Sequence, residues 1–298
     1  MSRLKLQYIL PFIALLVLGL LVAGVFYKQN FSDSVTFPSL GDQESSFDCK
    51  SIDRDNLLVI LAVGQSIASN FGSVPHRPGP KVFSFYNGRC FHGDDPLPGA
   101  DGSGGSIWSR LGDLLIERGL AKNVLLVAVG SGGSSVSEWV PDGKFYPRLL
   151  DATSSLKKND LKPNLALWLQ GSRDRQMEPA LYRDLLQEFI YAFPFLGIQL
   201  GQPTRMLVAT HTRCKSGTSP ELQAAQRSVI DPGKFIFAGP NMDVLEDDKK
   251  YDGCHYNNLG LNTAAKMWLE AIEKAMPPPN AFPLAPTGLL TKPSNLQP

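Results

Sequence analysis

The fold is decided by residues 57–66, Leu57-Leu58-Val59-Ile60-Leu61-Ala62-Val63-Gly64-Gln65-Ser66. Seven consecutive apolar residues predict a short strand that is buried on both faces, as in a parallel sheet. Gly64 permits a sharp turn at the end of this strand. Open α/β sheets bind ligands beyond the carboxyl ends of their strands, so Ser66 stands where a functional side chain is expected. Most serines after strands are only turn residues, and this segment alone assigns Ser66 no role.

Four later apolar runs have the same character as the first. They predict strands at residues 124–129, 165–169, 205–210 and 235–238, and residues 82–86 have the pattern of a further short strand. Helical patterns occupy residues 107–119, 178–195, 219–230 and 259–275. Because strands alternate with helices along the chain, we predict a three-layer α/β/α sandwich with a five-stranded parallel sheet.

The chain begins with a candidate membrane segment. Arg3 and Lys5 precede an apolar run at residues 6–27, which at 1.5 Å per residue spans about 33 Å, close to the roughly 30 Å hydrocarbon core of a bilayer. Since the basic residues lie mainly on the N-terminal side, we expect the N-terminus in the cytoplasm and the rest on the extracytoplasmic, periplasmic side. A signal peptide cleaved near residues 22–24 is the alternative.

We divide the 298 residues into four segments. They are a transmembrane anchor (1–28), a polar linker (29–55), one α/β domain (56–276) and a Pro-rich tail without fixed structure (277–298). The formal net charge is +1, and the sequence has no basic patch interleaved with aromatic residues. This argues against nucleic acid as a partner.

The four cysteines are Cys49, Cys90, Cys214 and Cys254. An even number in an exported domain predicts two disulfides. Of three pairings we prefer Cys49–Cys90 with Cys214–Cys254, because the second pair joins two loops at the same sheet edge. Four free buried thiols are the alternative for a cytosolic domain. The sequence has no CxxC or HxxxH spacing, so we expect no metal, and we expect no cofactor.

A serine becomes a nucleophile only when a base takes its proton. The chain has four histidines, at positions 76, 92, 211 and 255. The first two lie in the long loop at residues 69–106 and the third ends a predicted strand. His255 follows Asp252 by three residues, so the carboxylate can hold the imidazole while the ring faces outward. Chance helix capping is the alternative for so short a pattern.

A tetrahedral intermediate needs donors aimed at its oxygen. The candidates are the backbone N–H of Ser66, that of a glycine in residues 130–133, for which we choose Gly133, and the side-chain amide of Gln170. The alternatives are a flexible turn for the glycines and an exposed amide at a strand end for the glutamine.

Four short blocks occur in order along the chain. They are Gly64-Gln65-Ser66, Gly132-Gly133-Ser134-Ser135 with Trp139, Gln170-Gly171-x-x-Asp174 and Asp252-x-x-His255. Together they resemble the SGNH (GDSL-type) hydrolases, in the branch of sialate O-acetylesterases and acetylxylan esterases, over residues 57–272. The resemblance implies a flavodoxin-like sandwich and ester hydrolysis through Ser66, with His255 as base and Asp252 orienting it. It also implies oxyanion donors at Ser66, Gly133 and Gln170.

Two positions depart from the family pattern: Ile67 stands where the family has Asn, and Ser172 where it has Glu. Neither removes a member of the triad. We therefore expect a membrane-anchored, extracytoplasmic serine esterase that removes O-acetyl or other short acyl groups from a carbohydrate. One alternative is a polysaccharide O-acetyltransferase with the same triad, working with envelope polysaccharide machinery. The other is a non-catalytic carbohydrate-binding envelope protein on a decayed hydrolase fold.

Overall fold

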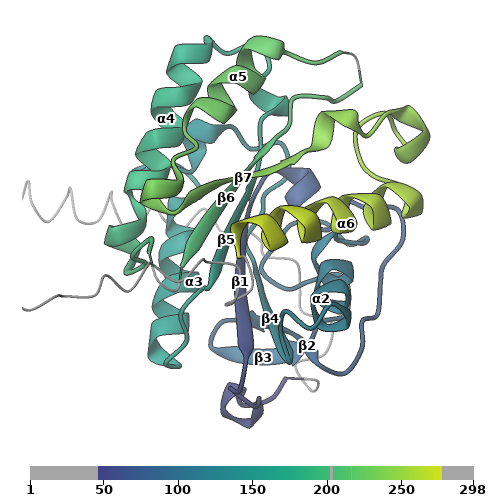
Figure 1. Cartoon of the computed structure of the whole chain (residues 1–298), viewed down its shortest axis with the longest axis vertical. Helices are drawn as coiled ribbons and strands as arrows, with labels where there is room; N and C mark the ends of the chain where they lie inside the picture. Colours follow the sequence, from purple (N-terminus) through teal and green to yellow (C-terminus); the bar gives the residue numbers. More distant parts are fainter. Residues whose placement is uncertain (1–45, 202–203, 216, 277–298) are drawn as a thin grey trace, which may run out of the picture. The chain divides into compact units, whose positions relative to one another are not determined.

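The central sheet has seven strands in the order β3-β2-β4-β1-β5-β6-β7 (Figure 1). The computed structural model describes residues 46–201, 204–215 and 217–276. The strands are β1 (Leu57–Gly64), β2 (Val82–Tyr86), β3 (Arg89–His92), β4 (Asn123–Ala128), β5 (Leu165–Leu169), β6 (Arg205–Thr210) and β7 (Ile236–Asn241). All neighbouring pairs are parallel except β2 with β3.

The predicted α/β class is confirmed, and the predicted number of strands is wrong. The five predicted strands are β1, β4, β5, β6 and β7, and they lie in the flavodoxin-like order β4-β1-β5-β6-β7. At one edge, β2 and β3 form a hairpin around Asn87 and Gly88, which both have positive φ. The further short strand predicted at residues 82–86 is β2, whereas β3, with exposed Arg89 and His92, lacks the apolar run of a strand buried on both faces and was not predicted.

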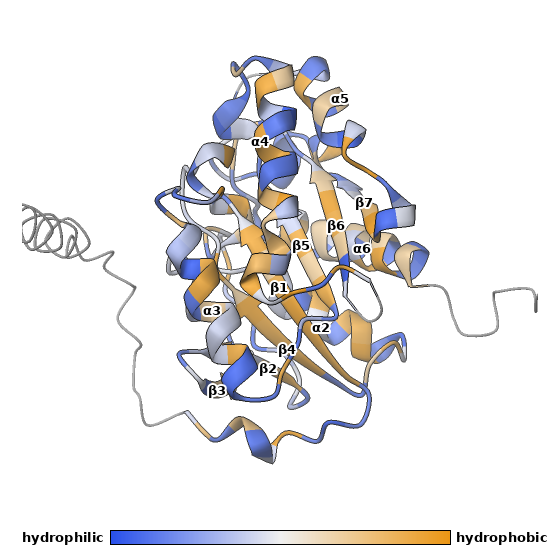
Figure 2. Ribbon diagram, turned by 90° about the vertical axis from the view of Figure 1, so that its left-hand side faces the viewer, coloured by the Kyte–Doolittle hydropathy of each residue, from blue (hydrophilic) through white to orange (hydrophobic). Residues whose placement is uncertain are grey.

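Two helical layers cover the sheet, as Figure 2 shows with the apolar strands between them. The helices are α2 (Trp108–Glu117), α3 (Tyr146–Lys158), α4 (Pro179–Tyr191), α5 (Pro220–Ser228) and α6 (Asn258–Ala275). Alternate β1 residues enter two separate cores: Val59, Leu61 and Val63 pack with α3, α4 and α5, and Leu58, Ile60 and Ala62 pack with α2 and α6. The strand β1 is therefore buried on both faces, as its seven consecutive apolar residues predicted.

Part of the predicted linker belongs to the domain. Phe47 pairs with Cys90 through a β-bridge, and Cys49 and Ile52 are buried in the core on the α3, α4 and α5 side. The disulfide Cys49–Cys90 fixes this segment to β3. The second disulfide joins Cys214 to Cys254, so the pairing is the one preferred from the sequence.

The predicted anchor at residues 1–28 and the predicted tail at residues 277–298 lie outside the described residues. Within the described ranges, no helix combines the length and the apolar character that a membrane span needs.

Candidate active site

Ser66 starts a 3-10 turn, η3 (Ser66–Ala68), directly beyond β1. Gly64 has φ +149°, and a Cβ at this position would lie 2.0 Å from the carbonyl oxygen of Leu169 on the neighbouring strand. Only glycine allows this approach of β1 to β5 without displacing the backbone. Ser66 itself is 6% exposed, so the core fixes the position of its hydroxyl.

His255 lies against Ser66, although 189 positions separate them in the sequence. Its Nε2 is 2.9 Å from Ser66 Oγ, and its Nδ1 is 2.7 Å from Asp252 Oδ2. A carboxylate accepts the Nδ1 proton and leaves Nε2 free to accept one from the hydroxyl. The arrangement of hydroxyl, imidazole and carboxylate is the one a general base needs to activate a serine.

Asp252 is held in its orientation by the backbone. Its Oδ1 accepts hydrogen bonds from the N–H groups of Cys254 and His255, at 2.9 and 2.7 Å. Partial burial raises the pKa of Asp252, but the hydrogen bonds from the backbone and imidazole of His255 and from Cys254 outweigh it and hold the pKa below its ordinary value. Asp252 is therefore ionised at neutral pH.

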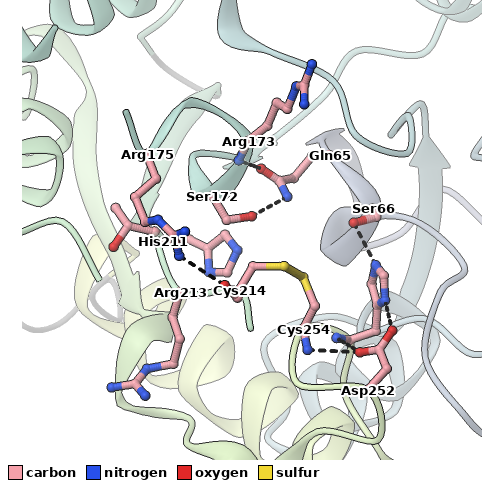
Figure 3. Close-up of a disulfide and its surroundings, with 12 residues drawn as sticks. Gln65, Ser66, Ser172, Arg173, Arg175, His211, Arg213, Cys214, Asp252 and Cys254 are labelled. Carbon is pink, nitrogen blue, oxygen red and sulfur yellow. Dashed lines mark hydrogen bonds and ion pairs between the residues drawn. A yellow bond between two sulfur atoms is a disulfide. The ribbon is translucent and has the colours of Figure 1, made fainter. Parts of the chain in front are cut away.

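Residues 250–256 form a short hairpin, here called the base loop, which carries both Asp252 and His255. Its ends pair through the bridge between Lys250 and Tyr256. The disulfide Cys214–Cys254 ties it to the segment after β6, as Figure 3 shows, and Lys215 N donates to Gly253 O at 2.8 Å. Cross-links to a neighbouring loop thus hold the base loop in place.

Two aromatic rings stack against the imidazole of His255. The ring centroids of Phe71 and Tyr251 lie 5.3 and 6.1 Å from that of His255, with interplanar angles of 22° and 29°. The hydroxyl of Tyr251 donates to Phe71 O at 3.1 Å. The two rings therefore fix the plane of the imidazole. Phe71 lies in the long loop, where no sequence pattern distinguished it.

Two predicted oxyanion donors are available on the same rim as Ser66. Among the described residues, the backbone N–H groups of Ser66 and Gly133 donate no hydrogen bond. Gly133 is exposed and has φ +67°, a conformation that favours glycine. The two N–H groups come from the segments that follow the neighbouring strands β1 and β4.

Gln170, the third predicted donor, does not face the site, and this corrects the sequence interpretation. Its side chain is fully buried, and its Nε2 donates to Ser134 O and Asp174 Oδ2, at 3.0 and 2.8 Å. Its Oε1 accepts from the hydroxyl of Tyr182 on α4 at 2.9 Å. Because its amide hydrogens bond to Ser134 and Asp174, Gln170 joins the end of β5 to the loop after β4.

The two departures from the family pattern have local partners. Ser172 accepts a hydrogen bond from Gln65 Nε2 at 2.6 Å, while Gln65 Oε1 accepts from the N–H groups of Gly171 and Arg173. Ile67 is buried in the core on the α2 and α6 side. The hydroxyl of Ser172 thus holds Gln65, directly before Ser66, and the packing of Ile67 holds the turn directly after it.

The other histidines have different surroundings. His211 is fully buried, and this burial lowers its pKa, so it is neutral at pH 7. His76 pairs with Asp113 at 2.8 Å, and His92 lies on the edge strand β3. His255 is the histidine that contacts Ser66.

Asp101 is a site neighbour that the sequence did not single out. It lies in the predicted long loop and accepts hydrogen bonds from Ser131 and Gly132, in the glycine-rich segment that carries Gly133. Its position within a run of glycines and serines gave no sign of this contact, because the partners are 30 residues away.

Comparisons with known proteins agree with this geometry. Residues 109–268, more than half of the chain, match the family model described as carbohydrate esterase, sialic acid-specific acetylesterase. This match includes Asp252 and His255 and begins after Ser66. A search of curated proteins found no match.

Two solved structures share the fold. A protein from Arabidopsis thaliana is 16% identical, with a TM-score of 0.60, and the alignment covers 74% of this chain and 97% of that one. NanS is 15% identical, with a TM-score of 0.52 and the same two coverages. The family match shows that the chain belongs to the sialic acid-specific acetylesterase family of carbohydrate esterases, which are carboxylic ester hydrolases.

Proposed function

We propose that the protein hydrolyses O-acetyl esters of a carbohydrate, with Ser66 as nucleophile, His255 as general base and Asp252 as the residue that orients His255. The observation that carries the proposal is the 2.9 Å separation of Ser66 Oγ and His255 Nε2, with Asp252 on the opposite ring nitrogen. The acetylated carbohydrate substrate follows from the family to which the chain belongs.

The reaction then has two halves. Ser66 Oγ attacks the ester carbonyl carbon as its proton passes to His255 Nε2, and the N–H groups of Ser66 and Gly133 stabilise the oxyanion. When the carbon–oxygen bond to the sugar breaks, His255 returns the proton to the departing alcohol oxygen. Water attacks the acetyl-serine in the second half, with His255 again taking and returning the proton, and acetate leaves.

Replacing the nucleophile tests the assignment. Ser66→Ala should reduce turnover of p-nitrophenyl acetate and of an O-acetylated sialic acid by about 10⁴-fold or more, because it removes the hydroxyl that His255 contacts. Ser69→Ala is the matched control, since the Ser69 hydroxyl ends the same turn and donates to Gln65 O. Turnover by Ser66→Ala at the rate of the control would rule out Ser66 as the nucleophile.

We also propose that the domain acts outside the cytoplasm, held to the membrane by residues 1–28. Two disulfides in the domain and the apolar run after Arg3 and Lys5 support this location. In cells that express the full chain, the protein should sediment with membranes, resist alkaline carbonate extraction and show no alkylatable thiol before reduction. A soluble protein with four alkylatable cysteines would contradict it.

A further inference from the structure

Asp101 contacts both of the segments that carry the two oxyanion donors, the one after β1 and the one after β4. Its backbone N–H donates to Gly130 O at 3.0 Å, and its carbonyl oxygen accepts from Asn70 N at 2.9 Å. Its carboxylate accepts from Ser131 Oγ and Gly132 N, at 2.7 and 3.0 Å. One residue therefore joins the segment after Ser66 to the glycine-rich loop after β4.

The carboxylate of Asp101 acts on the exposed part of the loop, between Ser131 and the buried Ser134, whose hydroxyl donates to Ser131 O at 2.9 Å. The start of the loop is fixed by Ser131 N, which donates to Gly64 O at 2.9 Å. Beyond it, Gly132 and Gly133 are exposed, and the bond from Gly132 N to Asp101 fixes the residue directly before the donor. Without that bond, two consecutive glycines have wide freedom in φ and ψ.

Asn70 completes the connection on the nucleophile side. It lies two residues after the end of η3, and its side-chain amide donates to Leu97 O and Ala100 O and accepts from Leu97 N. The segment that carries Asp101 is thereby docked on the turn that begins with Ser66. A shift of Asp101 would change the separation of the Ser66 and Gly133 N–H groups.

Arg148 on α3 keeps the carboxylate in place. Its Nη1 donates to Asp101 Oδ1 at 2.9 Å, and its side chain is 7% exposed. Burial raises the pKa of Asp101, but the hydrogen bonds from Ser131 and Arg148 outweigh it, so that the pKa lies below its ordinary value and Asp101 is ionised at neutral pH.

We propose that Asp101 is a positioning residue that sets the separation of the two oxyanion donors, the N–H groups of Ser66 and Gly133. The inference rests on the proposed function of these two groups. Donors preorganised toward the developing charge make a large contribution to catalysis, and small misplacements reduce the rate strongly.

The test compares two carboxylates of similar surroundings. Asp101→Asn should lower kcat by about 10- to 100-fold and change KM by less than about threefold, because the donors act mainly in the transition state. Asp113→Asn is the matched control: Asp113 contacts His76 Nε2 and Gly79 N at 2.8 and 2.9 Å, and its side chain is 26% exposed against 28% for Asp101. Its kcat should stay at the wild-type value.

Inhibition by methylboronic acid separates positioning from a structural effect. The tetrahedral adduct on Ser66 places an oxygen between the two donors. The inhibition constant should therefore rise in Asp101→Asn by the same factor by which kcat/KM falls. Should Asp101→Asn fail to fold, Ser131→Ala removes one hydrogen bond to the same carboxylate and should lower kcat and boronate affinity together, by about 3- to 10-fold.

Wild-type kcat in Asp101→Asn, or a lowered kcat with unchanged boronate affinity, would overturn the positioning role. Failure of the proposed function looks different, since turnover would then survive in Ser66→Ala and the boronate would not inhibit the wild type.

Discussion

The proposed nucleophile, Ser66, and the proposed base, His255, reach the same rim in different ways. Ser66 follows a strand that pairs with β4 on one side and β5 on the other, and it is 6% exposed. The side chains of His255 and Asp252 are 19% and 36% exposed, on a base loop held by a disulfide and a few hydrogen bonds. The core thus positions one reactive group and local cross-links position the other. Changes to the side chains of Asp252 and His255 should therefore affect activity more than stability.

The largest expected separation of activity from stability comes from Asp252→Asn. An asparagine can still accept the backbone N–H groups of Cys254 and His255, so the base loop keeps its shape. The amide no longer stabilises the protonated imidazole, and kcat should fall by about 10⁴-fold. Kinetics and thermal unfolding of the same preparation measure both effects. A fall of less than about tenfold would contradict the assigned role.

The two disulfides provide a second contrast. Their sequence separations are 41 and 40 residues, so removing either should cost a similar stability, about 4 kcal/mol in the chain-entropy model. Loss of Cys214–Cys254 should also lower the kcat of the folded protein by about tenfold or more, because the base loop is released from its neighbour. Loss of Cys49–Cys90 should leave that kcat unchanged.

Double alanine variants of each pair, assayed well below their unfolding temperatures, make the comparison. Equal kcat values in the two double variants would show that the disulfide beside His255 does not position the base loop.

The smallest expected effect is a change in how the stability of the protein depends on pH in acid, caused by Asp243. Asp243 accepts from the N–H groups of Thr212 and Arg213, at 2.8 and 2.7 Å, in the segment that carries Cys214. Burial raises the pKa of Asp243, but the imidazole of His211, 3.4 Å away, and the hydrogen bonds from Thr212 hold that pKa far below the ordinary 3.8. A depressed folded-state pKa stabilises the fold above the unfolded value, and this contribution is lost as pH falls through the folded pKa.

Between pH 4 and pH 2, the free energy of unfolding should therefore fall less in Asp243→Asn than in the wild type. The slopes of this free energy against pH should differ by the equivalent of up to about one bound proton. Urea unfolding at several pH values measures it. Parallel stability curves for the two proteins would show that Asp243 titrates at its ordinary pKa.

Sequence patterns found the parts of the site that depend on local chemistry. The apolar run before Gly64 located the strand, and the spacing of Asp252 and His255 singled out two side chains that lie in contact with each other and, through His255, with Ser66. Sequence patterns failed where contacts between distant residues decide which way a side chain faces. Gln170 follows a strand as expected, yet its amide group is hydrogen-bonded to buried partners, among them Tyr182 on α4. Asp101 showed no periodic or motif signal, and the edge strand β3, unlike the predicted β2, lacks an apolar run.

The most direct test of the central claim is labelling with a fluorophosphonate, followed by mass spectrometry of the peptides. The wild type should carry the label on Ser66, and His255→Ala should label at least about 100-fold more slowly, because the hydroxyl then has no base to take its proton. Labelling at another serine, or labelling of His255→Ala at the wild-type rate, would contradict the coupling of Ser66 and His255.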